Sequence, residues 1–278
     1  MTIIVADTTC GLPPAMLADL GIPVVPQLVI FGEQSLRDDT ELTTELFLKK
    51  LRASSSLPKT AAPMPALYAP VFSKAAAAGE SVVVVAPSGK VSGTVRSAET
   101  ARLDFPQVDI RVVDTHTIAG CLASLVLLAH EMAASGAGAD QIVGKLNELV
   151  PRSRTYFVLD TLEYLQKGGR IGGAKALLGE LLQVKPILQI RDGQVEAFEQ
   201  ERTKRRATQR LIDIVCEQVA ASADPRLCVM HIDAVAELQA LRSALAARLQ
   251  LTDIPDYVLP PAIVVHAGPK CLAVGFFS

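Results

Sequence analysis

Short apolar runs alternate with longer amphipathic stretches through the first half of the chain. The runs at 2–7, 81–86 and 109–114 are rich in Val and Ile, and they predict buried strands. Apolar residues at helical spacing predict helices at 13–21, 38–54, 67–78, 93–103, 118–135 and 139–149. Prolines interrupt the pattern at 54–65, where we expect a loop. The alternation of strand and helix predicts a parallel sheet with helices on both faces.

The pattern changes near residue 160. After a strand at 155–160, two extended runs at 186–200 are joined by Asp192-Gly193, which is typical of a β-hairpin. Further elements are expected as helices at 203–222 and 234–250, a strand at 226–232, and short strands around a turn at 257–277. We therefore predict an α/β fold with two domains. Residues 1–160 form an N-terminal three-layer α/β/α domain with a mainly parallel sheet, and residues 161–278 form a C-terminal α/β domain with a mixed sheet.

The composition indicates a globular protein with an aliphatic core. Half of the 278 residues are apolar, yet only 4% are aromatic and none is Trp, so Ala, Leu, Val and Ile must fill the interior. The longest apolar segment, 118–129, ends at His130 and is shorter than the roughly 18 residues that a membrane span needs. The first residues lack the features of a signal peptide. We expect a cytoplasmic protein without a membrane-spanning segment.

Charge and cysteine usage exclude several classes of function. The five cysteines are scattered and none forms a CxxC pair, which indicates reduced thiols and offers no metal-ligand spacing. The net charge is −2, and no basic stretch carries interleaved aromatic residues, so nucleic acid is not an expected partner. No GxSxG motif is present. We expect no catalytic residue, no metal and no cofactor.

The segment "APSGKVSGT" at 86–94 joins a predicted buried strand to a predicted helix. A helix N-terminus at the carboxyl end of a parallel strand carries free N–H groups, which attract phosphate or carboxylate. Ser92 could equally be a plain N-cap of the helix. The two interpretations are compatible, because Gly93 would allow a ligand to approach the backbone closely.

Two further segments combine glycine with a polar side chain. "KGGRIGG" at 167–173 matches neither the P-loop nor the dinucleotide fingerprint, so it is either a flexible hinge or a functional loop that presents Arg170. "IVVHAGPK" at 263–270 places His266 at the end of a predicted apolar strand. That histidine is either an ordinary core or surface residue, or a group that donates to a carboxylate or shuttles a proton.

Two charged clusters each have a structural and a functional interpretation. The segment 201–210 carries Arg202, Lys204, Arg205, Arg206 and Arg210, which form either a solvated helix face or a docking surface for an acidic partner. An acidic cluster precedes the helix predicted at 38–54, and it could bind a cation or cap that helix; its members are Asp38, Asp39 and Glu41.

Taken together, these segments resemble the DegV family of bacterial fatty-acid-binding proteins. The resemblance covers nearly the whole chain and depends on the order of the segments "VADTTCGLPPAML", "IPVVPQLVIFGEQSLRDD", "LPKTAAPMP", "VSGTVRSAETA", "VVDTHTIAGC", "VLDTLEYLQKGGRIGG", "VKPILQIRDG" and "VHAGPKCLAVGFF". It implies two α/β domains that enclose one fatty acid, with the acyl chain in an apolar tunnel. It also implies that the protein has no activity alone. It implies further that a separate ATP-dependent kinase subunit would convert the bound acid to an acyl phosphate for phospholipid synthesis.

The resemblance also implies which residues hold the carboxylate of a C14–C18 acid such as palmitate. They are Thr60, Ser92, Gly93, Thr94 and His266. Arg170 would orient the phosphoryl group at the cleft, and the basic segment 201–210 would dock the kinase. This chain departs from the family at Ala61 and Ala62, where two polar side chains are usual.

Two functional hypotheses follow. In the first, the protein binds a long-chain fatty acid and presents its carboxylate to the kinase. The acyl tail supplies affinity at about 0.8 kcal/mol for each buried CH₂, and the head group supplies position. In the alternative, the protein is an enzyme that acts on a small phosphorylated or carboxylated metabolite in the interdomain cleft. The alternative predicts a polar pocket in place of a long apolar tunnel.

Overall fold

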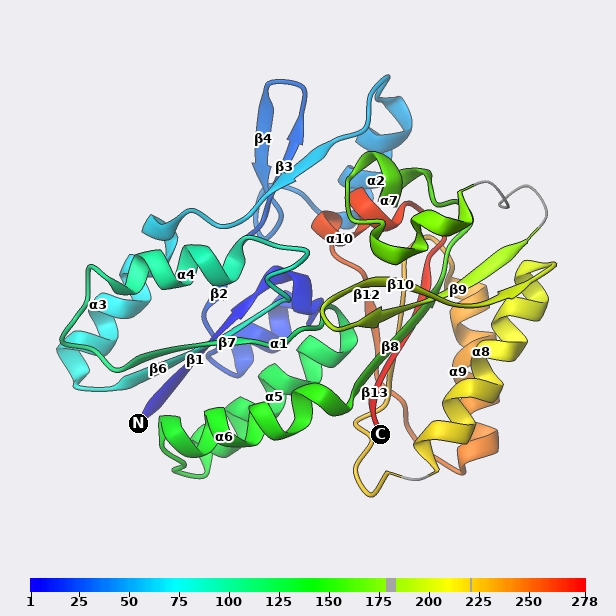
Figure 1. Cartoon of the computed structure of the whole chain (residues 1–278). Coiled ribbons are helices and arrows are strands. Elements are labelled where there is room, and N and C mark those ends of the chain that lie inside the picture. Colours follow the sequence, from blue (N-terminus) through cyan, green and yellow to red (C-terminus); the bar gives the residue numbers. More distant parts are fainter. Residues whose placement is uncertain (179–183, 221) are drawn as a thin grey trace.

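The computed structural model describes residues 1–178, 184–220 and 222–278. The strands within these ranges form three sheets. Figure 1 shows the first sheet lying between two layers of helices, and the second sheet with helices α8 and α9 on its outer side. The chain therefore has the α/β architecture predicted from the alternation of its apolar segments.

The first sheet is parallel throughout, in the order β2-β1-β6-β7. Its strands are β1 (Thr2–Asp7), β2 (Val24–Val25), β6 (Ser81–Ala86) and β7 (Ile110–Asp114). Successive side chains of a strand point to opposite faces. Val82 and Val84 pack against one helical layer, whereas Val83 and Val85 pack against the other. The two layers are α3 (Ala69–Ala78) with α4 (Thr94–Arg102), and α5 (Gly120–Ala134) with α6 (Ala139–Leu149). The predicted three-layer arrangement is confirmed.

The second sheet is mixed, in the order β10-β9-β8-β13-β11-β12. Its neighbouring strands are antiparallel except for the parallel pair β11 and β12. The strands are β8 (Ser153–Val158), β9 (Lys185–Arg191), β10 (Gln194–Glu201), β11 (Cys228–His231), β12 (Asp256–Val258) and β13 (Leu272–Phe277). One face packs against α8 (Lys204–Val219) and α9 (Val235–Leu249) through residues such as Val274. The other face contributes Phe157 and Ala273 to the large core that also contains α5.

The hairpin predicted from Asp192-Gly193 is confirmed. Asp192 has φ 49° and Gly193 has φ 81°, the conformation of the turn that fits the twist of two antiparallel strands. The turn touches the first domain, because the Ser88 hydroxyl donates to the Gly193 carbonyl at 2.7 Å. A Cβ at position 193 would lie 2.4 Å from Ser88 Oγ, so this contact requires glycine. The hairpin thus ties the second sheet to the loop at 86–94.

A third, small sheet was not predicted. It is antiparallel, in the order β4-β3-β5, and consists of β3 (Leu28–Phe31), β4 (Gln34–Arg37) and β5 (Lys59–Ala61). The strand β5 lies within the segment expected to be a loop. It fits there because Pro58 and Pro63 fall just outside its three residues. Pairing with β3, and not any local pattern, makes this segment a strand.

Several predicted boundaries are corrected by the local chemistry. The segment expected to form strands at 257–277 includes a helix, α10 (Pro261–Ala267), which begins with proline at its first position. Helix α2 (Thr44–Ala53) begins later than predicted, because the Thr43 hydroxyl accepts the Leu46 N–H and caps it. Helix α8 ends at Val219, and residue 221 of the predicted helix lies outside the described residues. The remaining helices are α1 (Pro14–Asp19) and α7 (Glu163–Lys167), with 3-10 turns at Thr8–Cys10, Pro65–Tyr68, Val150–Arg152 and Gly172–Leu177.

Sheet membership changes before the predicted domain boundary at residue 160. Strand β8, at Ser153–Val158, already pairs with β9 and β13 of the mixed sheet. If the two domains are divided by their sheets, the boundary falls ahead of Ser153. We propose this boundary as an alternative to the predicted one at residue 160. In the three described ranges, no helix is both long and apolar enough to cross a membrane.

Candidate ligand-binding site

A cavity lies between the loops that follow the strands of the parallel sheet and the inner face of the mixed sheet. It is lined by Ile118 and Ala119, which precede α5, by Phe157 of β8 and by Ala273 of β13. The atom-free space amounts to about 880 Å³ including the open mouth. Residues from both halves of the chain therefore form this cavity.

Most of the cavity wall is apolar. The apolar side chains come from the mixed sheet, from α7 and α10, and from loops, and they are Val91, Ile118, Ala119, Phe157, Leu165, Ile190, Val195, Leu259, Ala262, Ile263, Ala267, Cys271 and Ala273, with Ala62 at the edge of β5. Polar lining residues are fewer, namely Thr9, Gln27, Thr60, Ser92, Thr155, Arg170 and His266. A wall of this kind favours an alkyl chain over a polar metabolite.

Thr60 and His266 meet across the cavity wall, although 206 positions separate them. Strand β5 carries Thr60 and helix α10 carries His266, and the Thr60 Oγ1 to His266 Nε2 distance is 2.8 Å. The other ring nitrogen, Nδ1, is buried and has no hydrogen-bond partner among the described residues. It packs against Gly168, where a Cβ would lie 2.3 Å from it. The glycine of "KGGRIGG" thus makes room for the histidine ring.

Burial controls the charge of His266. It lowers the pKa of the imidazole to about 4, because the charged form loses water, and the positive charge of Arg170 acts in the same direction. The ring is therefore neutral near pH 7. A neutral imidazole can accept or donate one hydrogen bond at Nε2, and here it is engaged with Thr60.

The loop at 86–94 brings Ser92, Gly93 and Thr94 to the same cavity region. Gly93, not Ser92, is the N-cap of α4, and its carbonyl accepts the Ser97 N–H at 3.0 Å. Ser92 lines the cavity, and its Oγ lies 2.9 Å from Thr94 Oγ1. Ser92 is therefore not the N-cap residue itself, although its hydroxyl accepts the Thr94 N–H of the first turn at 3.3 Å. A Cβ on Gly93 would lie 3.1 Å from Ala62 Cβ, so the small residues at these two positions allow β5 and the loop to lie close together.

Behind Ser92 lies a buried polar network that the sequence analysis missed. Asp7, at the end of β1, is 1% exposed and accepts hydrogen bonds from Thr9, Gln27 and Thr94. Burial raises the pKa of this carboxyl, and the hydrogen bonds act in the opposite direction. An acidic residue at the carboxyl end of the first strand was the available signal, because strand ends in parallel sheets gather polar groups.

Arg170 reaches the cavity from the loop after α7. Its Nε donates to the Val91 carbonyl at 3.2 Å, and its Nη1 donates to the Gly168 carbonyl at 2.8 Å. It therefore connects the glycine-rich loop to the loop at 86–94, and lines the cavity with its remaining surface. Of the two interpretations of "KGGRIGG", these contacts favour the functional loop over a free hinge.

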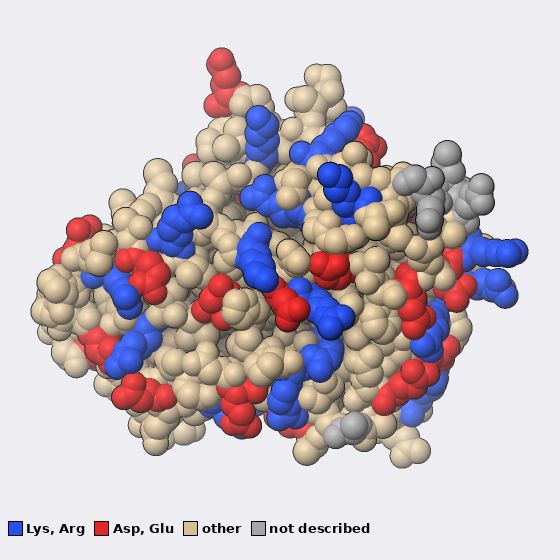
Figure 2. Space-filling view, in the orientation of Figure 1, with Lys and Arg blue, Asp and Glu red and all other residues tan. Residues whose placement is uncertain are grey.

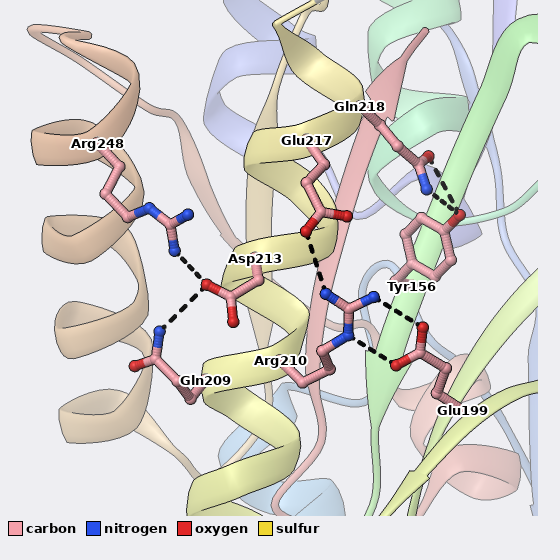
Figure 3. A network of polar contacts seen from close by, with 8 residues as sticks. All are labelled: Tyr156, Glu199, Gln209, Arg210, Asp213, Glu217, Gln218 and Arg248. Atoms are coloured by element: carbon pink, nitrogen blue, oxygen red, sulfur yellow. Dashed lines mark hydrogen bonds and ion pairs between the residues drawn. The ribbon is translucent and has the colours of Figure 1, made fainter.

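The basic residues at 201–210 lie away from this cavity. Lys204 donates to Asp160 Oδ1 at 2.6 Å, whereas Arg202, Arg205 and Arg206 are exposed. Further along α8, Arg210 binds both oxygens of Glu199 at 2.7 and 2.9 Å and also contacts Glu217, as Figure 3 shows. Arg210 is thus part of the contact between α8 and β10, and the first turn of α8 keeps the exposed positive charges.

The remaining charged features do not form a site. Arg37 pairs with Asp39 at 2.7 Å, and the Arg37 N–H donates to Glu41 at 2.8 Å. Neither of the two acidic residues caps α2, which Thr43 caps. Figure 2 shows positive and negative side chains mixed across one face of the molecule. In the part of the chain that the structure describes, no group of His, Cys, Asp and Glu is placed to hold a metal ion.

Comparisons with known proteins assign the family. A model described as an uncharacterised protein of the DegV family matches residues 1–278. A DegV domain-containing protein of Deinococcus radiodurans is 35% identical over 271 residues, which are 98% of this chain and 96% of the relative. A DegV family protein from Thermus thermophilus, described by its fatty acid binding, has a TM-score of 0.93 at 32% identity and covers 100% of this chain and 99% of its own. A stearic acid-binding protein from Eubacterium ventriosum has a TM-score of 0.90 at 25% identity. The match covers 100% of this chain and 98% of that protein.

Proposed function

The chain belongs to the DegV family, and on this premise we propose that it binds a long-chain fatty acid and presents the carboxyl end to a partner kinase. The observation that carries the proposal is the cavity itself, whose wall is apolar over most of its extent and polar around Thr60, Ser92 and His266. Relatives of the same fold are described as binding fatty acids, which supports the choice of ligand.

The acyl tail supplies most of the affinity. Each CH₂ removed from water contributes about 0.8 kcal/mol, so a palmitoyl-length tail contributes roughly 10 kcal/mol before the entropy of immobilisation is subtracted. Aliphatic walls from Ile118, Leu165, Ile190 and Ile263 suit such a tail. The polar wall adds little affinity but fixes the position of the head group.

The head group is held by neutral hydrogen-bonding groups. We assign Ser92 and Thr60 as its direct partners, with Gly93 and Thr94 shaping the loop and His266 holding Thr60 in place. This assignment extends the sequence prediction. Ala61 and Ala62 supply no polar side chain, so the hydroxyls of Thr60 and Ser92 must do more of the binding than in relatives with polar residues there.

We also propose that the partner is a kinase and that the protein is cytoplasmic. The chain brings no cofactor of its own, and the phosphoryl donor would be the partner's ATP. Arg170 would stabilise negative charge at the mouth of the cavity. Arg202, Arg205 and Arg206, with Lys204 beside them, would attract an acidic partner surface, chiefly by raising the rate of association.

Extraction of the purified protein tests the ligand. Organic extraction followed by mass spectrometry should recover a C14–C18 fatty acid in about equimolar amount. Recovery of a small phosphorylated or carboxylated metabolite in place of lipid would favour the alternative enzyme. The apolar wall argues against that alternative, since a polar substrate would leave its groups unpaired there.

Replacement of the predicted head-group ligand tests the site. Ser92→Ala removes one hydrogen bond worth about 1 kcal/mol, so bound fatty acid should exchange roughly five- to tenfold faster. Exchange can be followed with a radiolabelled fatty acid. Ser73→Ala on the exposed face of α3 is the matched control and should exchange like the wild type. Equal exchange rates for the two variants would show that Ser92 does not bind the head group.

A further inference from the structure

The carboxylate of Asp7 is surrounded by hydrogen-bond donors. The Thr9 N–H and the Thr9 hydroxyl donate to Oδ1 at 2.8 and 2.7 Å. Gln27 Nε2 and the Thr94 hydroxyl donate to Oδ2 at 2.6 and 2.7 Å. Two N–H groups and two hydroxyls supply the four hydrogen bonds that an ionised carboxylate accepts, and we take Asp7 as ionised on this geometry although burial raises its pKa.

The ionised Asp7 fixes the direction of the next hydrogen bonds. A carboxylate can only accept, so Thr94 must donate its one hydroxyl hydrogen to Asp7. The amide of Gln27 must present Nε2, because an amide oxygen 2.6 Å from Asp7 Oδ2 would be repelled. The same Nε2 reaches Thr94 Oγ1 at 2.9 Å. The Thr94 hydroxyl therefore donates its single hydrogen bond to Asp7 and only accepts from its other neighbours.

This direction extends to Ser92 at the cavity wall. Ser92 Oγ lies 2.9 Å from Thr94 Oγ1, and since Thr94 has no hydrogen to offer, Ser92 donates to Thr94. Ser92 Oγ also accepts the Thr94 N–H at 3.3 Å. What Ser92 offers the cavity is a lone pair. A ligand atom that binds Ser92 in this arrangement must carry a hydrogen.

On the opposite wall, Thr60 offers a hydrogen. Nδ1 of His266 is buried against Gly168 without a hydrogen-bond acceptor in the described part of the chain. The tautomer that avoids a buried, unpaired N–H carries its hydrogen on Nε2 and donates to Thr60 Oγ1 at 2.8 Å. The Thr60 hydroxyl is then free to donate to the ligand.

One acceptor and one donor match a neutral carboxylic acid, whose O–H donates and whose C=O accepts. We propose that the resting site takes the fatty acid in its neutral, protonated form, and that Asp7 is the positioning residue that imposes this by fixing the Thr94 and Ser92 hydroxyls. The inference rests on the proposed function and goes beyond it, because it specifies the chemical form of the ligand. Binding near pH 7 then takes up one proton from solvent for each fatty acid bound.

The charges around the site are compatible with a neutral head group. The titratable groups that face it or lie behind the network are Asp7, Cys10, Asp38, Tyr68, Arg170, His266 and Cys271, and Lys59 and Lys90 are exposed nearby. Burial raises the pKa values of Cys10 and Cys271 to about 12, so both thiols are uncharged. Burial also raises the pKa of Asp38 to about 7, and that of Tyr68. Two backbone carbonyls already occupy Nε and Nη1 of Arg170.

Carbon-13 NMR tests the proposal directly. Palmitic acid labelled at its carboxyl carbon is bound to the full-length protein, and its chemical shift is followed as pH is varied. We expect the signal of the bound label to stay at the protonated position from about pH 6 to about pH 8, where an unperturbed carboxyl with a pKa near 4 is ionised. A bound label that is ionised throughout this range would overturn the inference and leave the proposed function intact. A label that does not bind would instead count against the proposed function.

Two variants assign the effect to Asp7. In Asp7→Asn, the new N–H groups donate to Thr94, which frees the Thr94 hydrogen for Ser92 and the Ser92 hydrogen for the ligand. The pKa of the bound acid should then fall by about 2 units, the size of shift that hydrogen bonds to the charged form produce. If Asp7→Asn does not fold, Thr94→Val removes the hydroxyl that links Asp7 to Ser92. It should shift the pKa of the bound acid in the same direction.

Thr100→Val is the matched control, because Thr100 lies on the exposed side of the same helix. It should leave the titration of the label unchanged. If the pKa of the bound acid is the same in Thr94→Val, Thr100→Val and wild type, the hydrogen bonds from Asp7 through Thr94 to Ser92 do not determine whether the acid is protonated.

Discussion

Burial changes the chemistry of single residues at the head-group site. His266 would be about half protonated near pH 6.5 in water, but it is neutral in the fold because its charged form would lose hydration beside Arg170. A neutral ring can hold Thr60 without a counter-ion. Burial likewise raises the pKa of Asp7, and four hydrogen bonds to its carboxyl act in the opposite direction.

The lowered pKa of His266 predicts a loss of stability in acid. Below pH 6.5 the unfolded chain protonates this histidine and the folded chain does not, so the free energy of unfolding falls as pH falls from 6.5 towards 4. The shift from 6.5 to about 4 corresponds to about 3 kcal/mol. His266→Gln keeps a donor for Thr60 and does not titrate, so its urea unfolding should depend less on pH in this window.

His116→Gln is the control, because His116 is exposed. It should retain the pH dependence of the wild type. If His266→Gln and wild type lose stability in parallel between pH 6.5 and 4, burial of the neutral imidazole is not the cause.

At the scale of elements, neighbouring strand ends assemble the polar wall. Strands β1 and β6 are parallel neighbours, so Asp7 at the end of one lies near the 86–94 loop at the end of the other. The helix α5 begins beside them in an unusual conformation. Ala119, which lines the cavity, has φ 60° and ψ −130°, a region that only glycine adopts without strain.

The strain at Ala119 predicts that glycine stabilises the fold. Release of about 1–3 kcal/mol of backbone strain should exceed the roughly 0.5–1 kcal/mol that the greater freedom of unfolded glycine costs. Ala119→Gly should therefore raise the free energy of unfolding by about 1 kcal/mol in urea titrations of lipid-free protein. Ala134→Gly near the end of the same helix, where the backbone is helical, should be destabilising by a similar amount. A loss of stability in Ala119→Gly would contradict the strain.

At the scale of the whole molecule, one continuous core joins the two sheets. It includes Val83 and Val85 of the parallel sheet, Leu122 of α5, and Phe157 and Ala273 of the mixed sheet. The cavity lies against this core and takes walls from both sides. A ligand there would contact residues from both halves of the chain and stabilise them together.

Removal of the fatty acid should lower the stability of the protein. A ligand at one hundred times its Kd stabilises the folded state by about 2.7 kcal/mol, so delipidated protein should unfold at a lower temperature, and added palmitate should restore the Tm. Because the core is shared, unfolding should remain a single transition when followed by calorimetry. A Tm that does not change with palmitate would contradict binding in this cavity.

The sequence by itself determined most of the order of elements, the parallel and the mixed sheet, the hairpin turn and the family, because strand and helix periodicity, turn residues and ordered motifs are local features. It also identified Ser92, Thr60, Arg170 and His266 as candidates. It did not reveal the strand β5, whose partner is β3. It also did not reveal the helix at 261–267, because the apolar run was interpreted as a strand although its prolines are typical of a helix start.

Only the tertiary structure decided how the candidates combine. Thr60 meets His266 across 206 positions, and Asp7 meets Thr94 across 87. No local pattern encodes such pairs, because they arise when separate elements pack on one core. The direction of each hydrogen bond, and hence the form of ligand that the site accepts, depends on burial and on distances between these distant residues. Those are properties of the folded chain alone.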